Sequence, residues 1–314
     1  RINVNNQNII DIIKINPQLV VFVGFFIYAF SLGAMFPRLD DIQTSFAIDK
    51  AELGLLLLCI PLGLQVTLVF ADRLVRAIPL KNIICTGIPS ICFMQFAAVA
   101  INQISFFAFF LIVCGSFVAV VEVAINLEAD RVEHALGSRI MNRSHAFWSI
   151  GFFSAAVVGA LFSQFKVMLE IHFLLICMIS FVTSKIIFKD YVVASPRHAN
   201  VTKIKKFSLP TGPIFVMVLF TMSAMLVEGA SIDWSVIFMR EIHYASPFLS
   251  GFSLAMAAFS QALIRFFGDN LLNKFGPTFI SIASLFFMSL GVILVILSSS
   301  SILAILGFLF MGAG

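Results

Sequence analysis

The stretch LGLLLLCIPLGLQVTLVFADRLVR, residues 53–76, contains the pattern that decides the fold, because a long apolar run ends in a short charged string. A continuous apolar run of about 20 residues is long enough for a helix to cross the hydrocarbon core of a bilayer. A second charged string, Gly268-Asp269-Asn270, also lies between two apolar segments, and Asp269 follows Asp72 by 197 residues. We therefore predict short charged turns between membrane spans, in a chain that is internally duplicated.

The composition excludes a soluble domain. The chain is 60% hydrophobic and 11% charged, with a mean hydropathy of +1.04, whereas soluble proteins carry about 25% charged residues. The five cysteines all lie inside apolar stretches and form no CxxC pair, so we interpret them as packing residues rather than as metal ligands or disulfides. No HExxH motif or phosphate loop occurs, so we expect no enzymatic activity, metal or cofactor.

Continuous apolar runs are typical of membrane helices, and they differ from the alternating segments of an outer-membrane barrel. The sequence predicts an all-α, polytopic membrane protein with about ten spans. The expected spans are 18–37, 53–71, 80–99, 104–127, 145–164, 169–188, 212–233, 248–267, 276–298 and 301–314, the last being cut short.

Positive charges are distributed unevenly between the two sides of these spans. Of the 20 Lys and Arg residues, 16 fall on the side of the N-terminus, and Arg265 at the end of the eighth span is counted among them. The other four are Arg38, Lys50, Lys166 and Arg240. Because loops rich in Lys and Arg stay in the cytoplasm, we expect a cytoplasmic N-terminus. The net charge of +4 is therefore explained by the Lys and Arg residues that orient the protein in the membrane, and we expect no nucleic-acid partner.

The offset between the charged strings also relates the spans themselves. Shifting 80–99 by this offset gives 277–296, which matches the ninth expected span. The prediction is a parallel repeat: an N-terminal six-helix half (1–188), a cytoplasmic linker (189–211), and a C-terminal half (212–314) that is truncated in its fourth helix.

On these features the chain resembles the major facilitator superfamily, whose fold is a two-fold repeat of six-helix bundles. The loop between its second and third helices usually reads Gly-x-x-x-Asp-Arg-x-Gly-Arg-Arg/Lys; here Asp72, Arg73 and Arg76 match, while Leu68 and Val75 replace the glycines. The resemblance implies a cytoplasmic gate in which Asp72, and Asp269 in the second copy, meet a helix N-terminus and a cationic partner. An anion near a helix N-terminus gains about 0.3–1 kcal/mol.

A further set of charges lies between the fourth and fifth expected spans. Arg139 and Arg143 are four residues apart, and Glu133 precedes them. We expect the two arginines to share one helical face and, with Glu133, to form a charge network that latches the two helices. This network would serve gating rather than solute contact.

A narrower resemblance covers most of the chain. It rests on Ala34-Met35-Phe36-Pro37-Arg38-Leu39, on Glu122 with Asn126 four residues later, on His145-Ala146-Phe147-Trp148-Ser149-Ile150-Gly151, and on Glu228-Gly229-Ala230 leading to Asp233-Trp234-Ser235. These segments are similar to bacterial inner-membrane transporters related to the fucose permeases, which are sugar–proton symporters. The resemblance implies a multi-pass protein of the inner membrane. The chain departs from fucose permeases in the first span, because Asp40 and Asp41 lie beyond Pro37.

Glu122 is the candidate proton carrier. It lies in the otherwise apolar stretch from Phe117 to Ile125, where a carboxylate must face a cavity or be protonated. A carboxyl group in such surroundings is suited to taking up and releasing protons. Asn126 lies on the same helical face and is expected to bind Glu122 or a polar solute. The alternative is a hydrogen bond between packed helices with a purely structural role.

The other candidate cavity residues are Gln65, Glu228, Asp233, Trp234 and Gln261. Glu228 and Asp233 are expected near the outer end of the seventh span, about 140° apart around the helix unless Gly229 breaks it. The resemblance implies that Glu228 points inward. Trp234 is either a stacking wall of the cavity or an interfacial tryptophan. Gln65 and Gln261 occupy nearly equivalent positions in the two copies.

These residues support three hypotheses of function. The first is a secondary active transporter that moves a small polar solute, a sugar being one candidate, by alternating access and proton symport. The second is a proton-driven exporter of drugs or metabolites, and the third is a membrane receptor that does not transport its ligand. The expected partners are the solute, protons and the lipid bilayer, and we expect a monomer.

Overall fold

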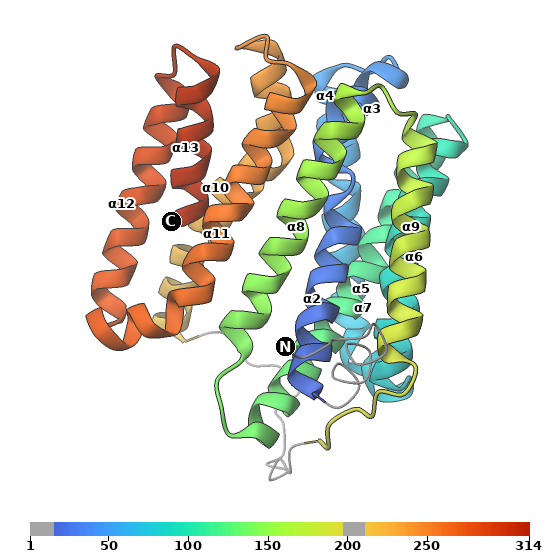
Figure 1. Ribbon diagram of the computed structural model, residues 1–314, viewed down its shortest axis with the longest axis vertical. Coiled ribbons are helices and arrows are strands. Elements are labelled where there is room, and N and C mark those ends of the chain that lie inside the picture. Colours follow the sequence, from blue (N-terminus) through green and yellow to red (C-terminus); the bar gives the residue numbers. More distant parts are fainter. Residues whose placement is uncertain (1–15, 197–210) are drawn as a thin grey trace, which may run out of the picture.

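The computed structural model describes residues 16–196 and 211–314, and every regular element in these two ranges is a helix (Figure 1). The helices run roughly parallel to the long axis of the molecule, alternately up and down. In chain order they are α2 (Pro17–Gly33), the short 3₁₀ helix η1 (Phe36–Arg38), α3 (Leu39–Ser45), α4 (Lys50–Leu57), α5 (Cys59–Ala77), α6 (Leu80–Ala100), α7 (Ile104–Leu136), α8 (Met141–Gln164), α9 (Leu169–Phe188), α10 (Gly212–Glu241), α11 (Pro247–Phe275), α12 (Pro277–Ile296) and α13 (Ser301–Ala313).

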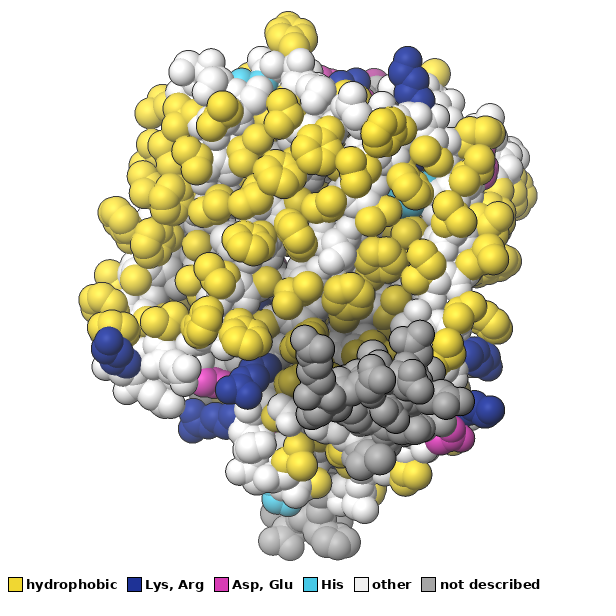
Figure 2. All heavy atoms as spheres, in the orientation of Figure 1, with side chains coloured by type: hydrophobic (Ala, Val, Ile, Leu, Met, Phe, Trp, Pro, Cys, Tyr) yellow, Lys and Arg dark blue, Asp and Glu magenta, His cyan; other side chains and the backbone are white. Residues whose placement is uncertain are grey.

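Nine helical segments within the described residues are long and apolar enough to cross a membrane. The tenth expected span is present as the shorter apolar helix α13. Figure 2 shows hydrophobic side chains over the middle of one face, with most of the visible Lys and Arg side chains near its lower edge. The chain is therefore a polytopic membrane protein, as the continuous apolar runs predict.

The first two spans are broken rather than straight. Helix α2 ends before Pro37, which lies in η1, and α3 continues the same membrane segment to Ser45. Asp40 and Asp41 therefore lie in the first turn of α3, within the segment that we expected to end at Pro37. Helix α4 begins at a capping box in which Asp49 and Glu52 each accept a backbone hydrogen bond from the other residue.

The prediction that the charged strings form turns is wrong. Asp72 and Arg76 lie in the last two turns of α5, and Asp269 lies in the second-to-last turn of α11. The helices extend beyond their apolar runs because polar side chains are tolerated in a helix once it leaves the membrane. The connections themselves are shorter, at Ile78–Pro79 and at Gly276, which has a φ of +78°.

The structure reproduces the spacing of the two copies. Helices α6 and α12 begin 197 residues apart, at Leu80 and Pro277, and α7 and α13 begin 197 residues apart, at Ile104 and Ser301. We call α2–α9 the N-terminal helices and α10–α13 the C-terminal helices. Residues 197–210 of the expected linker and the N-terminal residues 1–15 lie outside the described ranges.

Helices α5 and α7 approach each other closely at two glycines. A Cβ atom on Gly63 would lie 1.9 Å from the carbonyl oxygen of Ile112, and one on Gly115 would lie 2.0 Å from that of Ile60. Small residues let membrane helices pack backbone to backbone, which gains dispersion contacts where lipid supplies no hydrophobic drive. The position of Glu122, two turns further along α7, depends on this contact.

We expect Gly115→Ala to destabilise the protein by about 1–3 kcal/mol, because the added methyl group must push two helix backbones apart. Thermal unfolding in detergent measures the change as a lower midpoint. The matched control is Gly229→Ala in α10, where a Cβ atom would meet nothing within 4 Å. Equal midpoints for the two variants would contradict the close α5–α7 contact.

The first residues after α9 are anchored to α7. Glu128 is 1% exposed, and its Oε1 atom accepts hydrogen bonds from the Tyr191 hydroxyl at 2.6 Å and from the Ala194 amide at 2.9 Å. Burial raises the pKa of Tyr191, and the hydrogen bond to Glu128 raises it further. The first residues of the expected linker are thereby fixed to α7.

Tyr191→Phe should lower stability by about 1–3 kcal/mol at pH 8, because the buried carboxylate of Glu128 loses a donor. This deficit should shrink above about pH 10, the ordinary pKa of tyrosine. Above this pH, Tyr191 loses its proton when the protein unfolds, because its pKa is higher in the folded state. The stability of the unmutated protein therefore falls with rising pH, and the phenylalanine variant has no such proton to lose. Unfolding midpoints from pH 8 to 11 measure the effect. Tyr244→Phe is the control, since Tyr244 is 89% exposed; a deficit independent of pH would refute the anchor.

Candidate functional site

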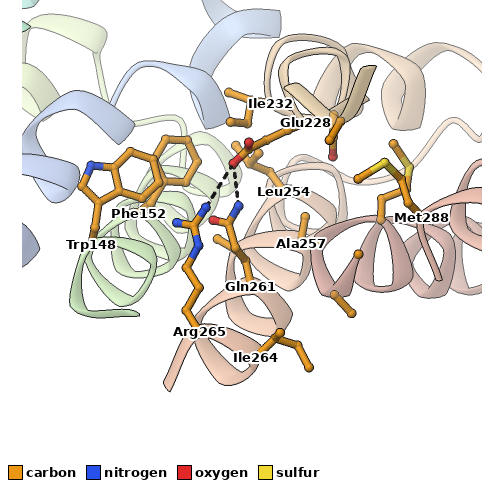
Figure 3. Close-up of a pocket in the computed structure, with 17 residues that line it drawn as sticks. Trp148, Phe152, Glu228, Ile232, Leu254, Ala257, Gln261, Ile264, Arg265 and Met288 are labelled. Atoms are coloured by element: carbon orange, nitrogen blue, oxygen red, sulfur yellow. Dashed lines mark hydrogen bonds and ion pairs between the residues drawn. The ribbon is translucent and has the colours of Figure 1, made fainter. Parts of the chain in front are cut away.

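A cavity of about 200 Å³ lies where α8 meets α10 and α11 (Figure 3). Helices α12 and α13 complete its wall. Most of its lining is apolar, and its charged side chains are Glu228 from α10 and Arg265 from α11. The lining residues are Trp148, Phe152, Ala224, Glu228, Ser231, Ile232, Leu254, Ala257, Ala258, Gln261, Ile264, Arg265, Met288, Met311, Gly312, Ala313 and Gly314.

The polar groups of the cavity gather on one side. Gln261 and Arg265 are four residues apart in α11, so both project from the same helical face, and Figure 3 shows them pointing toward Glu228. Gln261 Nε2 donates to Glu228 Oε1 at 2.5 Å, and Arg265 Nη2 lies 3.8 Å from the same oxygen. The Glu228 carboxylate therefore lies in the cavity, close to the amide of Gln261 and the guanidinium of Arg265.

Glu228 was expected near the outer end of its helix, and that expectation is wrong. Helix α10 runs without a break from Gly212 through Gly229 to Glu241, so Glu228 lies in its middle. The apolar run that defined the span ends earlier than the helix does. Helix length was underestimated because the last two turns of α10 carry the charged residues Arg240 and Glu241.

Arg265 links the two sets of helices. Its Nη1 atom donates to Ser149 Oγ of α8 at 3.1 Å, and Ser149 Oγ lies 3.0 Å from Gln261 Oε1. The carboxylate of Glu122 on α7 lies within electrostatic range of the guanidinium. Arg265 was expected as one of the loop charges, and this role was not predicted. The four-residue spacing between Gln261 and Arg265 places both side chains on one helical face, and this pattern could have predicted the role.

Glu122 is held from two sides on the N-terminal helices. Asn126 Nδ2 donates to Glu122 Oε1 at 2.8 Å and also to the Glu122 carbonyl at 2.9 Å. The Tyr28 side chain of α2 is close enough to interact electrostatically with the carboxylate. Glu122 does not line the cavity itself. Its electrostatic interaction with Arg265 is the link between Glu122 and the cavity.

Three expected cavity residues lie elsewhere. Asp233 and Trp234 line a second cavity, of about 420 Å³, with residues of α4 and α5. A Cβ atom on Gly54 would lie 3.5 Å from the Trp234 ring. Gln65 is exposed on α5 and lines neither cavity. Glu228 and Asp233 line different cavities because five residues of a continuous helix turn their side chains about 140° apart.

We call the end of the bundle that contains Asp72 the Asp72 end; there a side-chain hydrogen bond between described residues joins the C-terminal to the N-terminal helices. Asn142 Nδ2, in the first turn of α8, donates to Asp269 Oδ1 at 2.6 Å. Asp269 thus lies beside a helix N-terminus. Asp72 instead pairs with Arg76 of its own helix at 3.0 Å, and both side chains are more than 70% exposed. Arg73 is exposed as well.

The expected network of Glu133, Arg139 and Arg143 takes a different form. Arg139 lies in the turn before α8, which begins at Met141, so the two arginines do not share a helical face. Glu133 Oε2 instead accepts from the backbone amides of Ile140 and Met141, at 2.7 and 2.9 Å. This carboxylate caps α8 and joins it to α7 through backbone groups.

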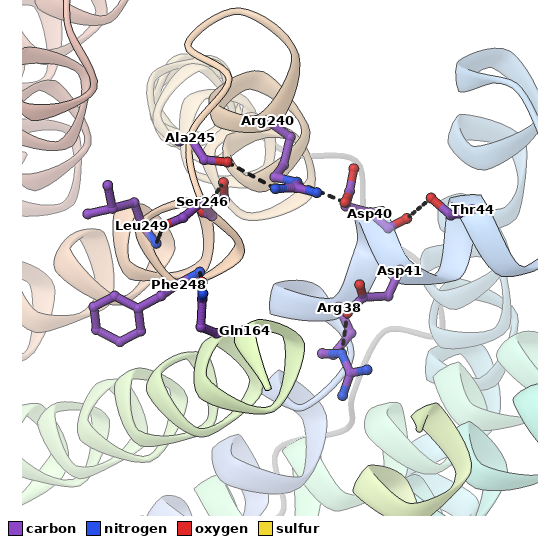
Figure 4. Close-up of polar contacts among 11 residues, drawn as sticks. Arg38, Asp40, Asp41, Thr44, Gln164, Arg240, Ala245, Ser246, Phe248 and Leu249 are labelled. Carbon is purple, nitrogen blue, oxygen red and sulfur yellow. Dashed lines mark hydrogen bonds and ion pairs between the residues drawn. The ribbon is translucent and has the colours of Figure 1, made fainter. Parts of the chain in front are cut away.

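At the opposite end, called the Arg240 end, ion pairs join the two sets of helices (Figure 4). Arg240 Nε donates to Asp40 Oδ2 at 2.9 Å, and its Nη1 donates to the Ala245 carbonyl at 3.0 Å. Lys50 of α4 pairs with Glu241 of α10. Gln164 Oε1, at the end of α8, accepts from the Phe248 amide of α11 at 3.1 Å.

Arg38, expected as a loop charge on this side, is a buried residue. Only 3% of its surface is exposed, and it pairs with Asp41 and donates to the Val167 carbonyl at 2.6 Å. Its Nη1 atom lies 3.2 Å from Nδ1 of the buried His172. Arg38 thus ties the end of the first span to the start of α9.

The comparisons with known proteins agree with this architecture. Residues 21–314 match the Major Facilitator Superfamily, and the chain belongs to this family. It is 27% identical over 309 residues to an uncharacterized MFS-type transporter of Yersinia pestis, covering 96% of this chain and 77% of that protein. It is 26% identical over 307 residues to an uncharacterized transporter of Sinorhizobium fredii, covering 96% of this chain and 79% of that protein.

Two solved structures share the fold. The nucleoside transporter NupG has a TM-score of 0.68 at 14% identity, covering 95% of this chain and 79% of that one. A bacterial homolog of the human lysosomal transporter Spinster, in an inward-facing and occupied conformation, has a TM-score of 0.63 at 15% identity and covers 94% and 72% of the two chains. The fold and the family are those of membrane transporters.

The ion pair between Asp40 and Arg240 predicts that Arg240→Gln opens the Arg240 end. A partly exposed pair contributes about 0.2–1 kcal/mol, so its loss should shift the equilibrium up to about fivefold. The readout is labelling of a cysteine at the buried cavity position Ser231 by an impermeant maleimide applied from that side, in a background without the five native cysteines.

Faster labelling is expected with Arg240→Gln and not with Lys166→Gln, which removes an exposed cation at the same end. Identical rates for the two variants would show that the pair does not hold the bundle closed.

Proposed function

We propose that the protein is a secondary active transporter that carries a small polar solute across the bacterial inner membrane by alternating access. The cavity lined by Glu228, Gln261 and Arg265 is the solute site. Transport is coupled to protons, and Glu122 is the proton carrier. The Asp72 end faces the cytoplasm, as the distribution of Lys and Arg predicts. The protein acts as a monomer.

The observation that carries this proposal is the ratio of charges at the centre of the bundle. Two carboxylates, Glu122 and Glu228, face one cation, Arg265. With both carboxylates ionised, the cluster holds one negative charge without a partner in a region where such a charge is costly. A proton on one carboxyl group removes that cost. In this proposal, one of the two carboxyl groups of the cluster carries the transported proton.

The cluster spans both sets of helices, which supports a link between proton binding and movement. Glu122 belongs to the N-terminal helices, and Glu228 and Arg265 belong to the C-terminal helices. In alternating access the two halves of a transporter rock about a central site. Rocking would change the separation of Arg265 from Ser149 and Glu122, and therefore the carboxylate that the cation neutralises.

The remaining residues take gating roles in this proposal. Asp269 at the N-terminus of α8 is the gate contact of the Asp72 end, together with the Glu133 cap. Asp72, Arg73 and Arg76 form the matching gate of the first copy, with Arg139 and Arg143 as exposed charges beside it. The ion pairs of Asp40 and Glu241 close the Arg240 end. Residues 1–188 and 212–314 act as the two moving halves.

The test is solute-driven proton movement in vesicles that contain the full-length transporter, with a panel of amino acids, sugars, nucleosides, organic acids and cationic dyes. A solute gradient should drive protons in the unmutated protein. Glu122→Gln should abolish this proton flux while solute exchange continues, because the exchange needs the cavity and not the proton carrier. Glu170→Gln, which removes a carboxylate at the start of α9, is the matched control.

Other outcomes discriminate among the alternatives. Proton flux that opposes the direction of a drug or dye would indicate an exporter. Flux that Glu122→Gln leaves unchanged would transfer the coupling role to another residue. Saturable binding without solute exchange, in either direction, would refute transport and indicate a receptor.

A further inference from the structure

The solute cavity has a charged side and an apolar side. Glu228, Gln261 and Arg265 lie together, whereas Met288 lies on the far side of the cavity from Arg265 (Figure 3), and Met311 is also part of the lining. Trp148 forms another part of the wall and stacks on Phe152, with ring centroids 5.4 Å apart and an interplanar angle of 18°. A solute that fits this cavity combines a compact charged group with an apolar one.

On the charged side of the cavity, both Arg265 and Glu228 have hydrogen-bonding capacity left for a ligand. An arginine side chain has five N–H donors, and among the described residues Arg265 donates one hydrogen bond, to Ser149. Its distance of 3.8 Å from Glu228 Oε1 is longer than a hydrogen bond. Glu228 accepts from Gln261 through the same Oε1 atom. The guanidinium and the carboxylate are thus close enough to attract each other and loose enough to accept a ligand.

We propose that this cavity binds a small zwitterion of the α-amino acid class with an apolar side chain. The solute carboxylate binds Arg265, the solute ammonium binds Glu228, and the side chain lies toward Met288 and Met311. The inference rests on the proposed function and names the solute class of the same site. In an α-amino acid the two charged groups are joined through one carbon atom, which matches the short gap between the two protein charges.

Charge balance favours a zwitterion over a singly charged solute. A bound anion alone would neutralise Arg265 and leave Glu228 beside a second negative charge. A bound cation alone would leave Arg265 without its nearest carboxylate. A zwitterion supplies one partner to each residue and leaves the net charge of the cavity unchanged, so no new charge is buried in the membrane.

The lining also disfavours a sugar. A sugar ring carries hydroxyl groups around its whole edge, and each one needs a partner when it is buried. Away from the charged side, the cavity offers Met288, and much of the remaining lining is apolar. A ring in this space would leave hydroxyl groups unpaired against apolar side chains, which is the basis on which binding sites reject polar solutes.

Tryptophan fluorescence gives a direct binding measurement. The chain has two tryptophans, so Trp234→Phe leaves Trp148, in the cavity wall, as the single reporter. The probes are leucine, methionine and phenylalanine, together with two analogues of leucine: 3-methylbutylamine, which lacks the carboxylate, and 4-methylpentanoate, which lacks the ammonium. Fucose and uridine represent the neutral polar solutes.

At least one of the three amino acids should change the Trp148 signal saturably, and each leucine analogue should bind at least about tenfold more weakly than leucine. The analogues test the inference on the unmutated cavity, so the result does not depend on whether a cavity variant folds. Saturable binding of fucose or uridine with no response to the amino acids would overturn the zwitterion and leave transport standing.

Two variants separate ligand contact from a structural role. Arg265→Gln should remove the preference for leucine over the amine, because the carboxylate has lost its partner. Glu228→Gln should remove the preference for leucine over the acid. Lys185→Gln, at an exposed position of α9, should preserve both preferences. If leucine is still preferred over both analogues in Arg265→Gln and Glu228→Gln, the inference is overturned. The absence of any solute-driven proton flux in vesicles would overturn the proposed function instead.

Discussion

The cost of placing charge inside a membrane is the constraint on which the rest of this structure depends. Arg265 lies in the middle of α11, and its positive charge is balanced from two sides, by Glu228 at 3.8 Å and by Glu122 across the bundle. Every neighbour of this cluster serves the same requirement. Ser149, Gln261 and Asn126 form hydrogen bonds with the charged groups.

The cluster also explains why the contacts at the two ends of the bundle matter. At the Arg240 end the two sets of helices are joined by ion pairs of Asp40 and Glu241, whereas at the Asp72 end Asn142 and Asp269 supply a single uncharged-to-charged hydrogen bond. Exposed or partly exposed contacts of this kind contribute little each. They can break and reform without a large barrier, and a carrier needs ends that open in turn.

Much of the fold follows from the sequence alone. A run of about 20 apolar residues must form a helix in lipid, since no other structure pairs its own backbone groups there. The number and order of the spans, and the offset of 197 residues between copies, were therefore predictable. The helix ends were not. Helices α5, α7, α10 and α11 continue beyond their apolar runs, so the charged strings and Glu228 were expected at the wrong depth.

The site was predictable only in part. Glu122 and Glu228 stand out because an acidic residue in an apolar run needs a reason, and Asn126 and Gln261 follow from helical spacing and the repeat. Arg265 was missed, since an arginine near the expected end of a span is explained equally well by membrane topology. Gln65 was expected in the central cavity because of its position in the repeat, and Asp233 was a candidate as an acidic residue on the same helix as Glu228. Helical periodicity gives only a direction around a helix axis. It does not give the neighbour that the direction meets.

The central claim is that two carboxyl groups share one arginine as their counter-ion, and infrared spectroscopy tests it most directly. A protonated carboxyl group and a carboxylate absorb at separate frequencies, so the number of protonated groups can be compared between variants at neutral pH. Replacing Arg265 by Gln should add a protonated carboxyl band relative to the unmutated protein, and Glu122→Gln or Glu228→Gln in the same background should reduce it. An unchanged band in Arg265→Gln would show that the carboxylates do not depend on this cation, and it would contradict the account.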